Sequence, residues 1–201
     1  MNIILASGSP RRKLLLEQMG INFEIIVPEV DESNNNDLEP EELVLHLATE
    51  KGKWVINQNR NTGFYISADT IVVHKHKVLG KPGTTKEAAE MLSVLSGATH
   101  SVFTGCFLAE ADDEGTIQKE LSFSVETKVT FSDLDKMEIE RYVKSGSPMD
   151  KAGSYGIQDD LGALFVKRID GDYYNVVGFP LNEFYNRLKS NFRNIYETLF
   201  A

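Results

Sequence analysis

The sequence contains a single cysteine, Cys106, which excludes an intrachain disulfide and any zinc site built from several cysteines. Cys106 lies in the apolar run 102–108, so we expect a buried thiol and a reducing compartment. No stretch approaches the length of a membrane-spanning segment, and only a short apolar piece precedes Arg11. These absences predict a cytoplasmic protein that is neither secreted nor inserted in a membrane.

The common nucleotide-binding and hydrolase signatures are also missing. Neither G-x-x-x-x-G-K-[ST] nor G-x-G-x-x-G occurs, and no G-x-S-x-G element marks a nucleophilic serine. His74 and His76 stand two residues apart in a predicted turn, where exposed polar residues are more common than zinc ligands. The pattern therefore disfavours a serine hydrolase and a histidine-bound zinc.

Positive charge is scarce. The 201 residues include 21 Lys and Arg against 30 Asp and Glu, a net charge of -9. An acidic surface repels polyanions unless cations are concentrated locally, so we expect neither nucleic acid nor a membrane as a partner. The cluster of cations from Arg11 to Lys13 is more informative for that reason.

Apolar periodicity and turn residues predict an α/β fold in one domain over residues 1–201. A strand at 3–5, a helix beginning at Pro10 behind the N-cap Ser9 and a strand at 23–27 are typical of a parallel crossover. We expect further strands at 64–73, 100–109, 122–131, 163–169 and 173–177, with the last two forming a hairpin, and helices from 40 and at 86–95, 136–144 and 181–192. The glycine-rich segment 149–158 predicts a structured loop near a site.

The junction between the first strand and the first helix is a candidate anion site. Ser7 precedes the helix, and Arg11 and Lys13 follow within its first turn. A helix N-terminus offers free N–H donors and a positive dipole end, to which these cations add. The alternative is that the basic residues are solvated surface charges.

Asp69 is the leading catalytic candidate because it interrupts the most strand-like segment of the chain. A carboxylate there needs a metal ion, a basic side chain or backbone donors as a partner. A purely structural hydrogen-bonding role is the alternative.

Metal-assisted phosphoryl chemistry would need hard oxygen ligands for Mg²⁺ or Mn²⁺, a carboxylate to direct a water, and cations to hold a polyphosphate. The residues that could supply these groups are the carboxylates Glu32 and Asp69 and the cations Arg11, Lys13, Lys51 and Lys81.

Seven short motifs occur in order along nearly the whole chain: LASGSPRR at 5–12, VDE at 30–32, ADT at 68–70, LGKP at 79–82, LSG at 95–97, DKAGSYGIQ at 150–158 and VGFPL at 177–181. Together they resemble the motifs of the Maf family, the septum-formation-inhibitor-type nucleoside triphosphate pyrophosphatases. The resemblance implies a mixed, elongated β-sheet flanked by helices, similar to inosine triphosphate pyrophosphatases, with two lobes around a cleft.

The same resemblance implies hydrolysis of a nucleoside triphosphate to the monophosphate and pyrophosphate with a divalent metal, and it suggests a homodimer. By analogy, Asp69 is the proton acceptor. The positions that would set substrate choice are Arg11, Thr70 and Gln158, and those that would line the metal and phosphate site are Glu32, Lys51 and Lys81, with Ser7 as a further phosphate contact.

The ADT and YGIQ motifs resemble the branch of the family that acts on dTTP and UTP. One departure is Asp159-Asp160-Leu161, which stands between Gln158 and Gly162 and adds negative charge beside the expected base pocket. Two alternatives stay open: a nucleotide-binding regulator of cell division that acts through a protein partner, and a pyrophosphatase for modified or purine nucleotides.

Overall fold

A mixed seven-stranded sheet organises the chain in the computed structural model, which describes residues 1–31, 38–158 and 161–200. The strand order is β2-β1-β3-β5-β6-β7, and β4 pairs with β3. The strands are β1 (Asn2–Ala6), β2 (Glu24–Ile26), β3 (Gly63–His74), β4 (Lys77–Leu79), β5 (Thr99–Ala111), β6 (Ile117–Phe131) and β7 (Val166–Asp170). Because β1 runs parallel to β2 and β3 while β4 and β7 pair antiparallel, the predicted mixed α/β class is confirmed.

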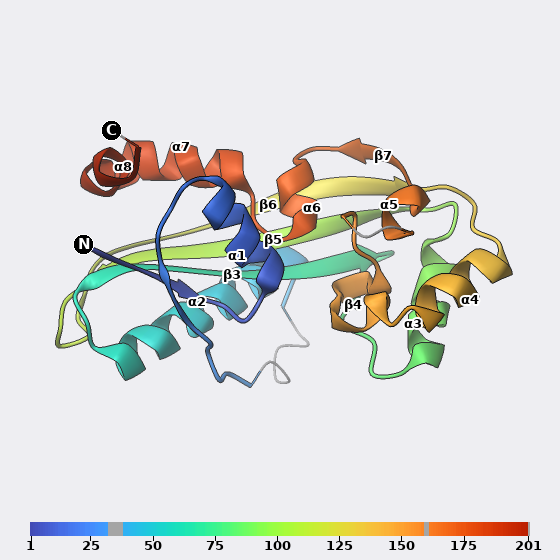
Figure 1. Cartoon of the computed structure of the whole chain (residues 1–201), viewed down its shortest axis with the longest axis horizontal. Helices are drawn as coiled ribbons and strands as arrows, with labels where there is room; N and C mark the ends of the chain where they lie inside the picture. Colours follow the sequence, from blue (N-terminus) through green and yellow to red (C-terminus); the bar gives the residue numbers. More distant parts are fainter. Residues whose placement is uncertain (32–37, 159–160, 201) are drawn as a thin grey trace. The chain divides into compact units, whose positions relative to one another are not determined.

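Helices connect these strands and flank the sheet (Figure 1). They are α1 (Pro10–Gln18), α2 (Pro40–Asn59), α3 (Thr85–Leu95), α4 (Lys136–Lys144), α5 (Gly162–Phe165), α6 (Tyr173–Val177), α7 (Leu181–Asn191) and α8 (Arg193–Phe200), with two short 3₁₀ helices, η1 (Ser147–Asp150) and η2 (Ala152–Ser154). No helix in the described ranges is long and apolar enough to cross a membrane.

The chain forms two compact units that are not successive segments of sequence. Unit 1 comprises Met1–Asp69, Thr104–Val125 and Gly178–Ala201, and unit 2 comprises Thr70–Phe103 and Glu126–Val177. The strands β3, β5 and β6 each pass from one unit into the other. Each unit nevertheless has a hydrophobic core of its own.

In unit 1, helices cover both faces of the sheet. One face carries Tyr65 and Phe107, which pack with Ala48 and Val55 of α2. The neighbouring residue Phe64 points to the opposite face, where its ring meets that of Phe192 just beyond α7, at 5.1 Å between centroids. This alternation follows from the two-residue period of a strand, and Figure 1 shows α2 and α7 on opposite sides.

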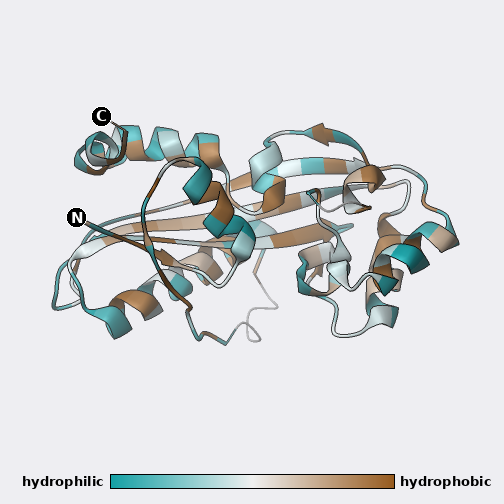
Figure 2. Cartoon of the chain, in the orientation of Figure 1, coloured by the Kyte–Doolittle hydropathy of each residue, from teal (hydrophilic) through white to brown (hydrophobic). Residues whose placement is uncertain are grey.

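In unit 2, α3 and α4 pack against the parts of the strands that belong to this unit. Leu92 and Tyr142 are among the buried side chains. Thr84 is the N-cap of α3: Glu87 N donates to Thr84 Oγ1, while the Glu87 carboxylate accepts from Gly83 N. In Figure 2 the strands carry the long hydrophobic stretches and the helices alternate, as half-buried helices do.

Most predicted elements are present, and three predictions are wrong in detail. Ser9 occupies the N-cap of α1, but its side chain makes no capping hydrogen bond. The helix that was predicted to begin at residue 40 extends through Asn59, and a further helix, α8, follows the predicted helix 181–192. Locally favourable helix geometry thus continued beyond the boundaries that polarity suggested.

The predicted hairpin of 163–169 with 173–177 is also wrong. Residues 173–177 form α6, and only 166–170 pair with β6. Asp172 Oδ1 accepts from Tyr174 N at 2.7 Å, and Asn175 Nδ2 donates to Val102 O at 3.0 Å. These contacts stabilise a helical turn in a segment whose aromatic and β-branched residues favour a strand.

Close packing of α2 on the sheet predicts that Gly52→Ala lowers the free energy of unfolding. A Cβ at Gly52 would lie 2.3 Å from the Phe107 ring and 2.7 Å from Ser67 Oγ, both buried. Overpacking lowers the free energy of unfolding by about 1–3 kcal/mol. The better helix propensity of alanine raises it by only about 1 kcal/mol, so the net change should be a loss. Urea denaturation measures the change, and Gly80→Ala is the control because nothing lies within 4 Å of its Cβ position. Equal midpoints for the two variants would contradict this packing argument.

Burial of His100 predicts that stability falls in weak acid. Desolvation, with a smaller effect from His74, lowers the pKa of His100 from 6.5 to about 4. Below pH 6.5 the unfolded chain therefore binds a proton that the folded chain excludes. The unfolding free energy should drop as the pH falls from 6.5 towards 4, by about 3 kcal/mol in total. The same titration of His100→Gln should give a flatter curve, and parallel curves would refute the assignment to His100.

Candidate active site

An ion pair between Asp69 of β3 and Lys51 of α2 is the centre of the candidate site. Lys51 Nζ lies 2.5 Å from Asp69 Oδ1, and the two side chains are only 11–12% exposed. The sequence expectation that Asp69 needs a partner is therefore met by a basic side chain. Both residues belong to unit 1.

The close approach of α2 to β3 explains how the pair forms. Ser67 and Asp69 are two residues apart, so they share the face of the strand that α2 covers. Ser67 Oγ donates to Ala48 O of α2 at 2.6 Å. One turn further along α2, Gly52 lies so close to the strands that a side chain would not fit between them. The helix backbone is thus held against the strand, and Lys51, one residue before Gly52, reaches the carboxylate.

The turn that follows β1 begins at the position along the sheet where Asp69 lies on β3. Ala6, the last residue of β1, pairs in parallel with Ser67 of β3. The chain passes from β1 through α1 to β2 on one side, and then through α2 to β3 on the other. Connections that diverge in this way leave a crevice at the carboxyl ends of the parallel strands, where ligands bind in open α/β sheets.

Ser7 and Arg12 shape this turn. The hydroxyl of Ser7 accepts from Ser9 N at 3.1 Å and from Arg12 Nη1 at 3.3 Å. Arg12 Nε donates to Gly178 O at 2.9 Å, which ties the start of α1 to the VGFPL motif near the end of the chain. Arg12 is buried, whereas Arg11 is half-buried.

The cations expected to hold an anion therefore differ in environment. Lys13 is on the exposed side of α1, with its ammonium 3.7 Å from Glu17. Sequence reasoning missed Arg12 as a structural contact, because adjacent arginines look alike until the helix phase is known. The first-turn cluster is thus divided between a buried arginine and more exposed cations.

Unit 2 holds three more of the predicted residues. Thr70 follows Asp69 in β3 and is half-buried, Lys81 is exposed just after β4, and Gln158 is exposed at the end of the glycine-rich loop. Gly153 N donates to Gly80 O at 3.1 Å, which joins that loop to the residue before Lys81.

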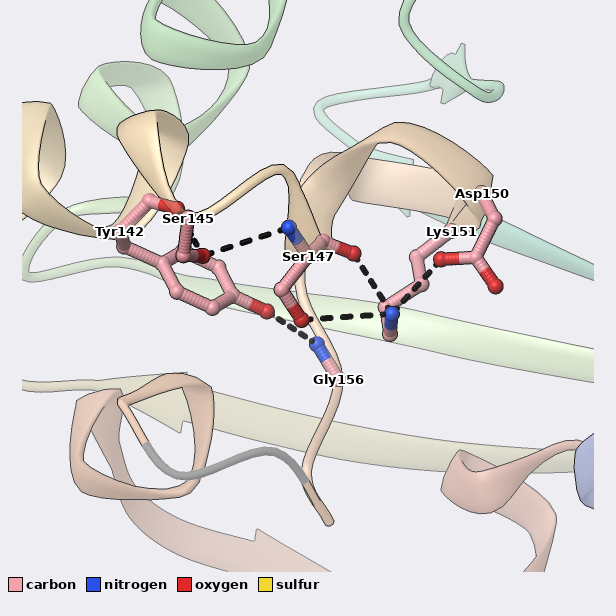
Figure 3. Close-up of polar contacts among 6 residues, drawn as sticks. All are labelled: Tyr142, Ser145, Ser147, Asp150, Lys151 and Gly156. Carbon is pink, nitrogen blue, oxygen red and sulfur yellow. Dashed lines mark hydrogen bonds and ion pairs between the residues drawn. The ribbon is translucent and has the colours of Figure 1, made fainter.

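Lys151 in the same loop is a buried cation that the sequence did not single out. Its ammonium donates to Ser147 O and to Asp150 Oδ1, both at 2.6 Å, as Figure 3 shows. These acceptors belong to η1, so Lys151 closes its own short turn. The neighbouring Asp150 and Lys151 in the sequence were the signal from which their ion pair could have been predicted.

The described residues form no metal site made of protein side chains alone. Glu32 and the pair Asp159-Asp160 lie outside the described residues. Within the ranges 1–31, 38–158 and 161–200, no group of three or more His, Cys, Asp or Glu is placed to hold a metal. Asp69 offers one hard oxygen donor, which suits an Mg²⁺ or Mn²⁺ ion that keeps its waters and binds substrate phosphates more than an all-protein cage.

Comparisons with known proteins cover nearly all of this chain. The family model described as Maf-like protein matches residues 2–191. A Bacillus cereus protein named dTTP/UTP pyrophosphatase is 47% identical over 93% of this chain and 94% of its own. A Lachnoclostridium phytofermentans protein of the same name is 44% identical over 93% of each chain.

Among solved structures, a Mycobacterium abscessus nucleoside-triphosphatase, titled also as a dITP/XTP pyrophosphatase, superposes with a TM-score of 0.39. It is 13% identical and the match covers 97% of each chain. The fold class of this chain is assigned from its own strand pairings.

The contacts of Arg12 predict that Arg12→Met lowers the free energy of unfolding by about 2 kcal/mol, because hydrogen bonds from a charged donor are lost in a buried place. Arg12→Lys should recover little, since one ammonium cannot reproduce the guanidinium geometry. The control Lys13→Met removes only an exposed pair and should change stability by less than about 0.5 kcal/mol. Urea denaturation compares the variants, and similar losses for Arg12→Met and Lys13→Met would show that the Arg12 contacts contribute nothing.

Proposed function

Because the chain belongs to the Maf family, we propose that it hydrolyses nucleoside triphosphates, dTTP and UTP in particular, to the monophosphate and pyrophosphate. The observation that carries the proposal is the shielded Asp69–Lys51 pair beside the carboxyl end of β1. Relatives at 44–47% identity that carry the name dTTP/UTP pyrophosphatase support the choice of reaction and substrate.

In the proposed reaction a water attacks the α-phosphorus of the triphosphate. The new bond joins the water oxygen to that phosphorus, the bond to the bridging oxygen breaks, and pyrophosphate leaves. Asp69 accepts the proton of the water, and Lys51 holds the carboxylate in a fixed orientation. Both groups are largely excluded from solvent, which strengthens their electrostatic interactions with the substrate.

The remaining predicted residues take binding roles in this proposal. Ser7, Arg11 and Lys13 lie at the start of α1, where N–H groups and positive charge favour phosphate oxygens. Lys81 also binds the triphosphate, while Thr70 and Gln158 contact the nucleoside and set its identity.

A divalent metal completes the proposal. Asp69 would hold Mg²⁺ or Mn²⁺ together with phosphate oxygens, and the bound ion would neutralise charge that develops on the phosphates. Arg11 and Lys81 serve the same electrostatic purpose from the protein side.

Pyrophosphate release from a panel of nucleotides tests the proposal directly. We expect dTTP and UTP to have the highest kcat/KM. Release from purine or modified nucleotides instead would replace the substrate assignment, and no release from any nucleotide with either metal would favour a nucleotide-binding regulator.

The proton-accepting role predicts that Asp69→Asn lowers kcat by about 10²- to 10⁴-fold, since an amide cannot take the proton. The variant should remain folded by circular dichroism. Asp170→Asn is the matched control because its carboxylate is 69% exposed and lies 3.7 Å from the exposed Arg168 guanidinium. Turnover of Asp69→Asn within a few-fold of the unmodified protein would exclude Asp69 as the proton acceptor.

A further inference from the structure

Gln158 is exposed at the end of an unusually well-buried loop. The five residues before it, Gly153 to Ile157, are all buried, although they belong to no regular strand or long helix. The position of Gln158 therefore depends on what holds this buried run.

The backbone of the run adopts a locally unfavourable conformation. Gly153 and Ser154 have φ values of +66° and +61°, in the left-handed region. For a residue with a side chain, such as Ser154, this costs about 1 kcal/mol. Gly153 also lies against Val72, whose methyl carbons would be 2.9 Å from a Cβ. Contacts from outside the run must supply the missing stabilisation.

Besides the bond from Gly153 N to Gly80 O, two of these contacts involve tyrosine hydroxyls. Tyr155 Oη lies 2.8 Å from His100 Nε2, and Gly156 N donates to Tyr142 Oη at 3.1 Å, as Figure 3 shows for Tyr142. His100 belongs to β5 and Tyr142 to α4, so both anchors stand on regular elements of unit 2. Side chains on regular elements hold a site more precisely than loops do.

The hydrogen bond to Tyr155 satisfies only one of the two ring nitrogens of His100. Its Nδ1 has no hydrogen-bond partner in the part of the chain that the structure describes, and the ring is only 2% exposed. The lowered pKa, about 4, keeps the ring neutral at neutral pH. An unsatisfied buried nitrogen is costly, which favours a role for the bond to Tyr155 beyond stability.

Packing around the two hydroxyls leaves little freedom. The Tyr155 ring meets the edges of His100 and Phe131 at centroid distances of 5.3 and 4.7 Å. A Cβ at Gly162 would lie 2.4 Å from Gly156 O and 2.8 Å from Tyr142 Oη. The chain on both sides of Gln158 is therefore packed on the same hydroxyl of Tyr142.

We propose that His100 and Tyr142 are positioning residues for nucleotide selectivity: they fix the buried run 153–157, so that Gln158 meets the base in one orientation. This inference rests on the proposed function for the identity of the ligand. Neither residue takes part in bond making or breaking, so the effect falls on discrimination among bases.

Tyr155→Phe and Tyr142→Phe test the proposal because each removes one oxygen atom. Selectivity is measured as the ratio of Kd values for non-hydrolysable α,β-imido analogues of dTTP and dCTP, which requires no turnover. We expect the ratio to shrink by about 5- to 10-fold, the equivalent of one hydrogen bond. In parallel, amide hydrogen exchange of peptides that cover 153–158 should become faster.

Thr127→Val is the matched control. Thr127 is fully buried in unit 2. Its hydroxyl donates to Asp172 O at 3.1 Å and accepts from Asp172 N and Asn175 Nδ2, both at 3.0 Å, and none of these partners belongs to the run. Its removal should lower stability but leave both the Kd ratio and the exchange of 153–158 unchanged. His100→Gln, whose side-chain amide can still hydrogen-bond a hydroxyl, should preserve more selectivity than His100→Phe.

A Kd ratio within twofold of the unmodified protein in both tyrosine variants would overturn the proposal, whether or not exchange accelerates. An equal loss of selectivity in Thr127→Val would overturn it as well, because the effect would then follow stability alone. Absence of pyrophosphate release from the unmodified protein would instead reject the proposed function, and the Kd ratios would still decide the positioning role.

Discussion

The close contact between α2 and the sheet is the constraint on which the candidate active site depends. Gly52 has no room for a side chain against Phe107 and Ser67, so the helix backbone is held at one distance from β3. That distance brings the Lys51 ammonium to the Asp69 carboxylate in a place that is largely dry. Removal of one member of such a pair leaves the other charge without compensation, which is costly. The position of the helix and the orientation of the carboxylate are therefore coupled.

The turn after β1 is organised by a contact between distant parts of the sequence. Arg12 holds Gly178 O and Ser7 Oγ at once, so the LASGSPRR and VGFPL motifs meet in space. Divergent connections on the two sides of β1 independently favour ligand binding at this edge. Within the motif at the start of the chain, the buried Arg12 thus shapes the turn, while Arg11 and Lys13 are more exposed.

Local pattern was sufficient for elements whose stabilisation is local, and it failed where distant partners decide. The strand 64–73 and the capping residues of α3 and α4 were predictable from periodicity and cap chemistry. Residues 173–177 were not, because Asp172 and the remote Val102 favour a helical turn over β-propensity. In the site, the partner of Asp69 could be predicted by class, but its identity as Lys51 required the packing of α2. The distinction between Arg11 and Arg12 likewise required the phase of α1.

Contacts between distant residues also determine the conformation of the loop that ends at Gln158. In the proposed function Gln158 meets the base, but the backbone before it contains glycines and left-handed residues that do not define one conformation alone. Hydrogen bonds to His100, which precedes the motif by some fifty residues, and to Tyr142 on α4 are among the contacts that hold this backbone. A change at either position can therefore alter the orientation of Gln158 while the motif itself stays intact. Under this proposal, substrate preference depends on the packing of unit 2 as well as on the motif residues themselves.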